Sequence, residues 1–206
     1  MGKDLLRQID AYYTDKVRKY GTTVQGVDWN SDEAQRLRFE QLTKIISGDT
    51  SEGFSICDYG CGLGDYYHYL GEKFLVYDYD GMDVSKEMVG LAQSKYPKAS
   101  FYVGSQLTQD FDYIVASGIF NVKQAFTNVQ WTKYILETLD MFNQYARKGF
   151  AFNCLTKYSD YDHQKDYLYY ADPLMIFGYC KRNFFKNVAL LHDYTLYDFT
   201  ILVRKG

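Results

Sequence analysis

Apolar residues in the N-terminal part of the chain recur at the spacing of two amphipathic helices. The first helix is predicted over residues 3–20, where leucine, isoleucine, tyrosine and valine side chains fall on roughly one face. The second is predicted to begin at Asn30 or Ser31 and to end near residue 46. Asn30 and Glu33 have the spacing of a capping box, which favours a helix start at this point.

Farther along the chain, short apolar runs alternate with amphipathic stretches. Strands are predicted at 54–58, 75–83, 100–105, 112–120, 150–155, 187–194 and 197–205, with helices at 66–74, 85–96, 131–147 and 172–182. Ser85 and Asp172-Pro173 are suitable helix starts, and Gly149 is predicted to end the helix over 131–147. This alternation predicts an α/β fold: a doubly wound, seven-stranded, mostly parallel sheet whose last two strands pair antiparallel.

Charge and composition narrow the classes of partner. The 206 residues carry 23 basic and 26 acidic side chains, a net charge of −3, without the basic excess that nucleic-acid binding requires. No apolar segment approaches the length of a membrane span, and residues 1–16 lack the apolar core of a signal peptide. We therefore expect a cytoplasmic protein without a membrane or nucleic-acid partner. The 22 tyrosines are dense towards both ends, which leaves a homodimer open as an alternative to a tyrosine-walled pocket.

The cysteine and histidine residues do not have metal-ligand spacing. The four cysteines form no CxxC pair, and the three histidines are scattered. We predict no metal site, and cysteines that remain reduced thiols.

The stretch "DYGCGLGD", residues 58–65, follows an apolar run and holds three glycines in five positions. Glycine at a strand-to-helix turn permits a tight turn and a close approach of ligand to backbone. The Lys and Ser/Thr of a phosphate-binding P-loop are absent, and Asp65 stands where a dinucleotide-binding GxGxxG turn has its third glycine. Asp58 and Asp65 favour a ligand with positive charge, such as a nucleoside that carries an amino acid tail instead of phosphate.

A second acidic position follows about 20 residues after the glycine turn, the spacing of a ribose-binding carboxylate in such folds. Asp83 is preferred for this role because it ends the second predicted strand, just before the helix cap at Ser85. Asp78 and Asp80 remain rivals.

Taken together, "ICDYGCGLGDYYHYL", "YDGMDVSKEMVGLAQSKYP" and "FDYIVASGIFN" resemble the class I S-adenosylmethionine-dependent methyltransferases, over about residues 50–155. The resemblance implies a Rossmann-like domain at 49–206, an N-terminal helical lid at 1–48, and S-adenosylmethionine as cofactor with S-adenosylhomocysteine (SAH) as product. It implies that Asp58 and the glycine turn line the methionine end and that Asp83 binds ribose. The cofactor-binding residues we expect are Asp58, Gly60, Cys61, Gly62, Gly64, Asp83, Val84, Ser105, Gln106, Ser117, Gly118 and Arg38.

The adenine contact departs from the family pattern. Where the family often has Asp after Gly, this chain has Gly104-Ser105-Gln106. Ser105, Gln106 or the Leu107 backbone are the candidates for this contact.

The resemblance also indicates where an acceptor binds. The end of the fourth strand faces the transferred methyl group in the family, so Phe120 and Asn121 are candidate acceptor contacts, with Trp29 and Tyr158 as further ones. The long aromatic and polar segment 156–170 is a candidate acceptor cap, and its one histidine, His163, is a candidate general base. Methyl transfer also proceeds by alignment alone, without a base.

The predicted function is transfer of a methyl group from S-adenosylmethionine to a small-molecule acceptor, at oxygen before nitrogen. The alternatives are a protein or RNA methyltransferase and a non-catalytic module that keeps the cofactor fold. The Asn/Asp-Pro-Pro-aromatic motif of base-amino methylation is absent after the fourth strand, where "SGIFN" stands. A dehydrogenase on a similar sheet is a more distant alternative.

Overall fold

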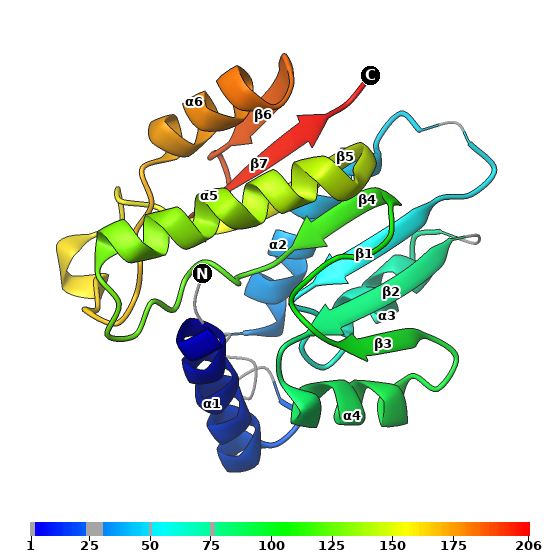
Figure 1. Ribbon diagram of the computed structural model, residues 1–206, viewed down its shortest axis with the longest axis horizontal. Helices are drawn as coiled ribbons and strands as arrows, with labels where there is room; N and C mark the ends of the chain where they lie inside the picture. The colour runs from blue at the N-terminus through cyan, green and yellow to red at the C-terminus, as the bar shows by residue number, and fades with distance from the viewer. Residues whose placement is uncertain (1–2, 24–30, 50, 75–76) are drawn as a thin grey trace.

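The structure, a computed structural model, describes residues 3–23, 31–49, 51–74 and 77–206, and Figure 1 shows its elements. The strands are β1 (Ser55–Tyr59), β2 (Asp78–Asp83), β3 (Ser100–Val103), β4 (Phe111–Ala116), β5 (Ala146–Leu155), β6 (Asn187–Leu191) and β7 (Asp198–Arg204). The helices are α1 (Lys3–Tyr20), α2 (Asp32–Thr43), α3 (Asp65–Gly71), α4 (Lys86–Lys95), α5 (Asn128–Tyr145) and α6 (Pro173–Asn183), with short 3-10 helices η2 (Lys44–Ile46) and η3 (Tyr161–His163).

Within these ranges the strands form one seven-stranded sheet in the order β3-β2-β1-β4-β5-β7-β6. Neighbouring strands from β3 to β5 pair parallel, whereas β7 is antiparallel to both β5 and β6. The predicted doubly wound sheet with an antiparallel last pair is therefore confirmed. The strand order reverses between β1 and β4, and ligands of such sheets bind at the carboxyl ends of the strands beside this reversal.

Helices cover both faces of the sheet, as Figure 1 shows. On one face, residues of α5 and α6 such as Trp131 and Ile176 pack on Phe150 and Phe152 of β5. On the other face, α2, α3 and α4 pack on the alternate strand residues, among them Ala151. This alternation in β5 is what a strand buried on both faces requires. None of the helices in the described ranges is long and apolar enough to cross a membrane.

The two N-terminal helices have different surroundings. α1 lies against α4, where Thr14 Oγ1 and Ser85 Oγ are 2.9 Å apart and the Arg18 guanidinium donates to Glu87 at 2.8 Å. α2 packs on β5 and β7, with Phe39 buried in the core of that face. α2 is thus a layer of the sheet domain, whereas α1 contacts the domain at the carboxyl edge of the sheet.

Two helix starts differ in detail from the prediction. The cap of α2 is Ser31, whose hydroxyl accepts a hydrogen bond from the Ala34 N–H, and Asn30 lies outside the described residues. α5 begins at Asn128, three residues before the predicted range, because Thr127 and Gln130 form a complete capping box. Ser85 and Asp172 cap α4 and α6 as predicted.

The prediction that Gly149 ends the long helix was wrong. α5 ends at Tyr145, and β5 begins at the next residue. Gly149 lies inside β5, where a Cβ atom would stand 2.5 Å from the Val203 carbonyl oxygen of β7. Glycine is required here by strand packing and not by a helix end.

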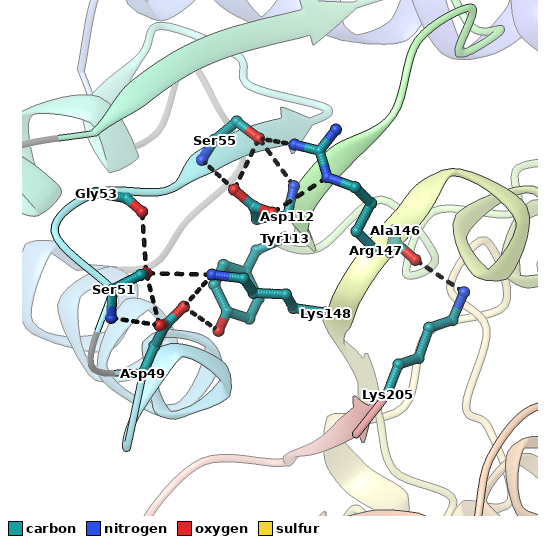
Figure 2. A network of polar contacts seen from close by, with 10 residues as sticks. All are labelled: Asp49, Ser51, Gly53, Ser55, Asp112, Tyr113, Ala146, Arg147, Lys148 and Lys205. Atoms are coloured by element: carbon teal, nitrogen blue, oxygen red, sulfur yellow. Dashed lines mark hydrogen bonds and ion pairs between the residues drawn. The ribbon is translucent and has the colours of Figure 1, made fainter.

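A network of charged side chains joins the amino-terminal ends of the strands, opposite the carboxyl edge (Figure 2). Asp49 accepts hydrogen bonds from the Ser51 N–H and hydroxyl, from Lys148 Nζ at 2.9 Å and from the Tyr113 hydroxyl at 2.7 Å. These hydrogen bonds, those from Ser51 first, hold the pKa of Asp49 well below its usual range. The network therefore connects the segment before β1 to β4 and β5.

Asp112, at the start of β4, likewise joins neighbouring strands through its carboxylate. It accepts from the Ser55 N–H at 2.9 Å and from Arg147 Nε at 3.2 Å. Burial opposes ionisation, but these hydrogen bonds outweigh it and lower the pKa of Asp112. Both carboxylates thus stabilise the fold in their charged forms.

We expect Asp49→Asn to lower the melting temperature at pH 7 by about 2–4 °C, the effect of about one net hydrogen bond in a protein of this size. The folded pKa of Asp49 is below its unfolded value, so this stabilisation is present above about pH 4 and is lost as the pH falls. The difference in melting temperature between variant and wild type, measured by circular dichroism, should therefore shrink below about pH 4. Asp193→Asn, at an exposed aspartate, is the control and should change little. An undiminished difference at pH 3 would contradict the role of the charge.

Candidate functional site

A pocket lies at the carboxyl edge of β1, β2 and β4, beside the reversal of strand order. The empty space between its walls, counted out to its open mouth, is about 840 Å³. The sheet contributes the ends of β1 and β2 and the turn after β4, and further walls come from α1, α2, α3, α4 and α5. In Figure 1, α1 lies beyond the arrowheads of these strands. The lining residues from the helices include Leu6, Ile9, Tyr13, Gln35, Phe39, Tyr66, Met88 and Tyr134.

The glycine turn after β1 forms the floor of this pocket. Gly60, Gly62 and Gly64 have φ angles of 82°, 52° and 78°, in the left-handed region that favours glycine. The N–H groups of Gly60 and Cys61 both donate to the Met82 carbonyl oxygen, at 2.7 and 3.0 Å. The turn is thereby fixed to the end of β2.

The glycines also admit protein side chains. A Cβ on Gly60 would stand 2.2 Å from Cγ2 of Ile119, and one on Gly64 would stand 2.8 Å from the ring of Phe101. We expected the missing side chains to make room for a ligand. At these two positions the space is filled by Ile119 and Phe101, so backbone conformation and packing already account for glycine there.

Asp58 is buried at the end of β1 and lines the pocket. Its Oδ2 accepts a hydrogen bond from the Tyr79 hydroxyl at 2.8 Å. The pKa of Asp58 is raised to about 7: burial raises it most, the Tyr79 hydrogen bond lowers it, and the nearby Asp83 and Asp65 also raise it. A cation placed in the pocket would favour the charged form of this carboxyl.

Asp83 lies at the end of β2, on the other side of the glycine turn. Its Oδ2 accepts from the Gly62 N–H at 3.0 Å, and its Oδ1 accepts from the Ser85 N–H at 2.9 Å. Burial raises the pKa of Asp83, while these two backbone hydrogen bonds lower it. A carboxylate accepts up to about four hydrogen bonds, so each oxygen retains capacity for a ligand hydroxyl.

The pocket is acidic as a whole. Asp58, Asp65 and Asp83 line it, and among the described residues that line it there is no lysine, arginine or histidine. Such a wall disfavours phosphate and favours a positively charged ligand. It fits the sulfonium and ammonium groups of S-adenosylmethionine. Among the described residues no three metal-ligating side chains gather, and all four cysteines are buried and free.

Most of the predicted cofactor residues lie together. The ones that line the pocket are Asp58, Gly60, Cys61, Gly62, Asp83, Val84 and Ser117. Ser105 and Gln106 line an adjoining hollow that shares Leu6, Tyr59 and Tyr134 with the pocket. The Tyr59 hydroxyl donates to the Ser105 carbonyl oxygen at 2.9 Å, which joins the two parts.

Arg38 is not part of the pocket, contrary to our prediction. Its guanidinium forms a buried ion pair with Asp198 at the start of β7 and donates to the Ala34 carbonyl oxygen at 3.1 Å. Asp198 is fully buried, and its charge is compensated by this arginine. The prediction that Arg38 binds the cofactor is therefore corrected: Arg38 joins α2 to β7 through the ion pair with Asp198.

The segment after β4 is held by hydrogen bonds from several elements. The Gly118 N–H donates to Asn153 Oδ1 of β5, and Trp131 Nε1 donates to the Phe120 carbonyl oxygen, both at 2.7 Å. Asn121 Oδ1 accepts from the Leu155 N–H at 3.0 Å. Ser117 and Ile119 are thereby presented at the pocket wall.

Three predicted acceptor contacts are placed differently from what we expected. The Phe120 side chain is fully buried in the core on the α5 face, and the Asn121 side chain bonds to β5. Tyr158 is 58% exposed, and its ring lies beside that of His192, outside the pocket lining. Trp29 and the side chain of His163 lie outside the described part of the chain.

Sequence reasoning missed the aromatic side of the pocket. Tyr134 of α5, Tyr66 of α3 and Phe39 of α2 line it, as does Tyr13 of α1. Their apolar spacing in helices was visible, but core and pocket residues share that spacing. Tyr79, which contacts Asp58, carried no signal because it stands inside a strand.

Comparison with known proteins gives one relative in sequence and many in structure. No family model matches the chain. Over 161 residues, 77% of this chain and 97% of the other, it is 49% identical to the "Putative methyltransferase Rv1506c" of Mycobacterium tuberculosis (strain ATCC 25618 / H37Rv).

Two solved structures illustrate the similarity in fold. Magnesium protoporphyrin IX methyltransferase (ChlM) from Synechocystis PCC 6803 with bound SAH aligns at a TM-score of 0.72 and 17% identity, over 99% of this chain and 100% of that one. The plantazolicin methyltransferase BpumL in complex with SAH aligns at a TM-score of 0.65 and 12% identity, over 99% of both chains. At these identities the two structures support the fold.

The corrected role of Arg38 makes a prediction about stability. We expect Arg38→Met to lower the free energy of unfolding by about 3–5 kcal/mol, because it leaves the Asp198 charge buried without its partner. Arg36→Met is the matched control on the same helix, since Arg36 pairs with Glu72 at the surface, and it should change the free energy of unfolding little. Urea denaturation measures both. The double variant Arg38→Met/Asp198→Leu should recover much of the stability lost in Arg38→Met. An Arg38→Met protein as stable as wild type would contradict the assignment.

Proposed function

This chain belongs to the class I S-adenosylmethionine-dependent methyltransferases, and we propose that it methylates a small-molecule acceptor at an oxygen atom. The observation that carries the proposal is the acidic pocket at the strand-order reversal, which has three lining carboxylates and no described cationic side chain. When bound, S-adenosylmethionine supplies a methyl group on a positively charged sulfur; its transfer to the acceptor oxygen yields SAH, and the acceptor loses its proton.

The chain's own residues would bind and orient the cofactor. We assign the ammonium group to Asp58 and the ribose hydroxyls to Asp83, the two carboxylates on either side of the glycine turn. Val84 and Gly104 line the pocket beyond Asp83, and the adjoining hollow at Ser105 and Gln106 supports an adenine contact there.

The acceptor would meet the methyl group at the rim formed by Ser117 and Ile119. Phe39 and Tyr66 also line the pocket, with their ring centroids 5.1 Å apart, and offer an aromatic wall that suits a small aromatic or aliphatic acceptor. Two proteins that share the fold are named for magnesium protoporphyrin IX and plantazolicin, which supports a small-molecule acceptor.

The lid that we expected from residues 1–48 is proposed for α1 alone. Leu6, Ile9 and Tyr13 of this helix line the pocket, whereas α2 is packed into the sheet domain. A lid of this kind excludes water from the transfer step. His163 as general base and Trp29 as acceptor contact stay predictions.

We expect SAH to bind at micromolar concentrations and Asp83→Ala to weaken binding by about tenfold or more, since it removes two acceptors for ribose hydroxyls. Asp80→Ala is the matched control: it stands on the same strand, bonds to Gln109 and does not line the pocket. Isothermal titration calorimetry with both variants and the wild type tests the assignment. Wild-type affinity in Asp83→Ala would reject the ribose role.

Methyl transfer itself is tested with labelled S-adenosylmethionine in cell extract, separated by a molecular-weight cutoff, with Asp83→Ala as control. We expect label in the small-molecule fraction, which would then be hydrolysed to distinguish oxygen from nitrogen acceptors. Label only in the large fraction would reassign the substrate to protein, RNA or polysaccharide. No label in either fraction, with SAH binding intact, would favour a non-catalytic module.

A further inference from the structure

Tyr79 is a buried strand residue whose hydroxyl reaches the pocket only through Asp58. It is 6% exposed and does not line the pocket, and its hydroxyl donates to Asp58 Oδ2 at 2.8 Å. Among the described residues this is the one hydrogen bond to the Asp58 carboxyl, and Oδ1 receives none. The Asp58 carboxyl is thus anchored on one oxygen and open on the other.

The ring of Tyr79 is held in place on two sides. Its centroid lies 5.1 Å from that of Tyr67 on α3 and 5.7 Å from that of Phe101 on β3. Phe101 is also the ring that packs against Gly64 in the glycine turn. The hydroxyl of Tyr79 therefore has a fixed position relative to the floor of the pocket.

A phenol that donates to a carboxylate stabilises the charged form of that carboxylate and fixes its orientation. Two carboxylates that face Asp58 act against its charge, Asp83 from β2 and Asp65 from α3. Tyr66 of α3, Cys61 of the turn and Cys57 of β1 face it as neutral groups, because burial raises the pKa of each. Lys95 of α4 pairs with Asp65 at 2.6 Å. Tyr79 is therefore the described group that favours an ionised Asp58.

We propose that Tyr79 is a positioning residue of the cofactor site: it aims the Asp58 carboxyl at the cofactor ammonium group and keeps that carboxyl charged near neutral pH. The inference rests on the proposed function, because it takes Asp58 as the partner of the ammonium group. On this inference Tyr79, a buried strand residue, sets the pH range in which the cofactor binds.

The test is the affinity for SAH from about pH 5.5 to 8, measured by calorimetry on the whole protein. In the wild type the affinity should rise with pH through about 7, since Asp58 becomes charged there. In Tyr79→Phe the rise should move upward by about one pH unit, the effect of losing a hydrogen bond to a charged group. The affinity ratio of wild type to variant should then be about tenfold at pH 6 and about twofold at pH 8.

Tyr113→Phe is the matched control. Tyr113 is likewise a buried strand tyrosine whose hydroxyl donates to a carboxylate, but this carboxylate is Asp49 at the opposite edge of the sheet. It removes the same atom and should leave the pH profile of SAH binding as in the wild type. In an Asp58→Asn background, Tyr79→Phe should lower the affinity no further.

The outcomes separate the inference from the proposed function. Absence of SAH binding in the wild type at every pH rejects the proposed function and the inference with it. Binding that does not vary with pH, or a Tyr79→Phe ratio that is equal at pH 6 and pH 8, rejects the inference alone. If Tyr79→Phe does not fold, 3-fluorotyrosine at position 79 replaces it; its more acidic hydroxyl should shift the profile to lower pH, and an unchanged profile rejects the inference.

Discussion

The left-handed backbone at the end of β1 is the constraint on which the site depends. Gly60, Gly62 and Gly64 turn the chain sharply enough for two successive N–H groups to reach one carbonyl, that of Met82 on the neighbouring strand. A third N–H, from Gly62, reaches the Asp83 carboxylate. The turn therefore holds the ends of β1 and β2 together and brings two carboxylates, Asp58 and Asp83, to the same pocket.

The sequence was sufficient to predict the layers of the fold and the floor of the pocket, because both are local. Strand and helix patterns of different period, the caps at Ser85 and Asp172, and the glycine turn each depend on a few consecutive residues. The errors have a common cause in contacts between distant residues. Arg38 was taken for a surface or ligand residue because its partner Asp198 is 160 positions away in the sequence. Gly149 was taken for a helix end because the sequence does not show that Val203 of β7 packs against it. Tyr79 and the aromatic wall belong to the same class, since only the folded chain distinguishes a pocket residue from a core residue.

The two edges of the sheet handle charge in opposite ways. At the amino-terminal edge, Asp49 and Asp112 are each paired with a cation and several hydrogen-bond donors, so their charges are compensated within the protein. At the carboxyl edge, Asp58 and Asp83 have polar partners but no described cation in the pocket lining. A ligand with positive charge completes the second edge, whereas the first is complete without one. Among the described residues, lysine and arginine thus stand beside Asp49 and Asp112, which stabilise the fold, and not beside Asp58 and Asp83.

The ion pair between Arg38 and Asp198 links the order of synthesis to the order of assembly. In the sequence α2 precedes all seven strands and β7 follows the other six. During synthesis Arg38 is therefore made before the sheet, and Asp198 is made only after six of its strands. Until β7 inserts between β5 and β6, the buried face of α2 lacks the carboxylate that compensates the Arg38 charge. The wall of the pocket that α2 provides, with Gln35 and Phe39, is therefore finished only when β7 is in place. A chain without β7 is left with an unfinished pocket, which makes ligand binding depend on a strand that does not itself line the pocket.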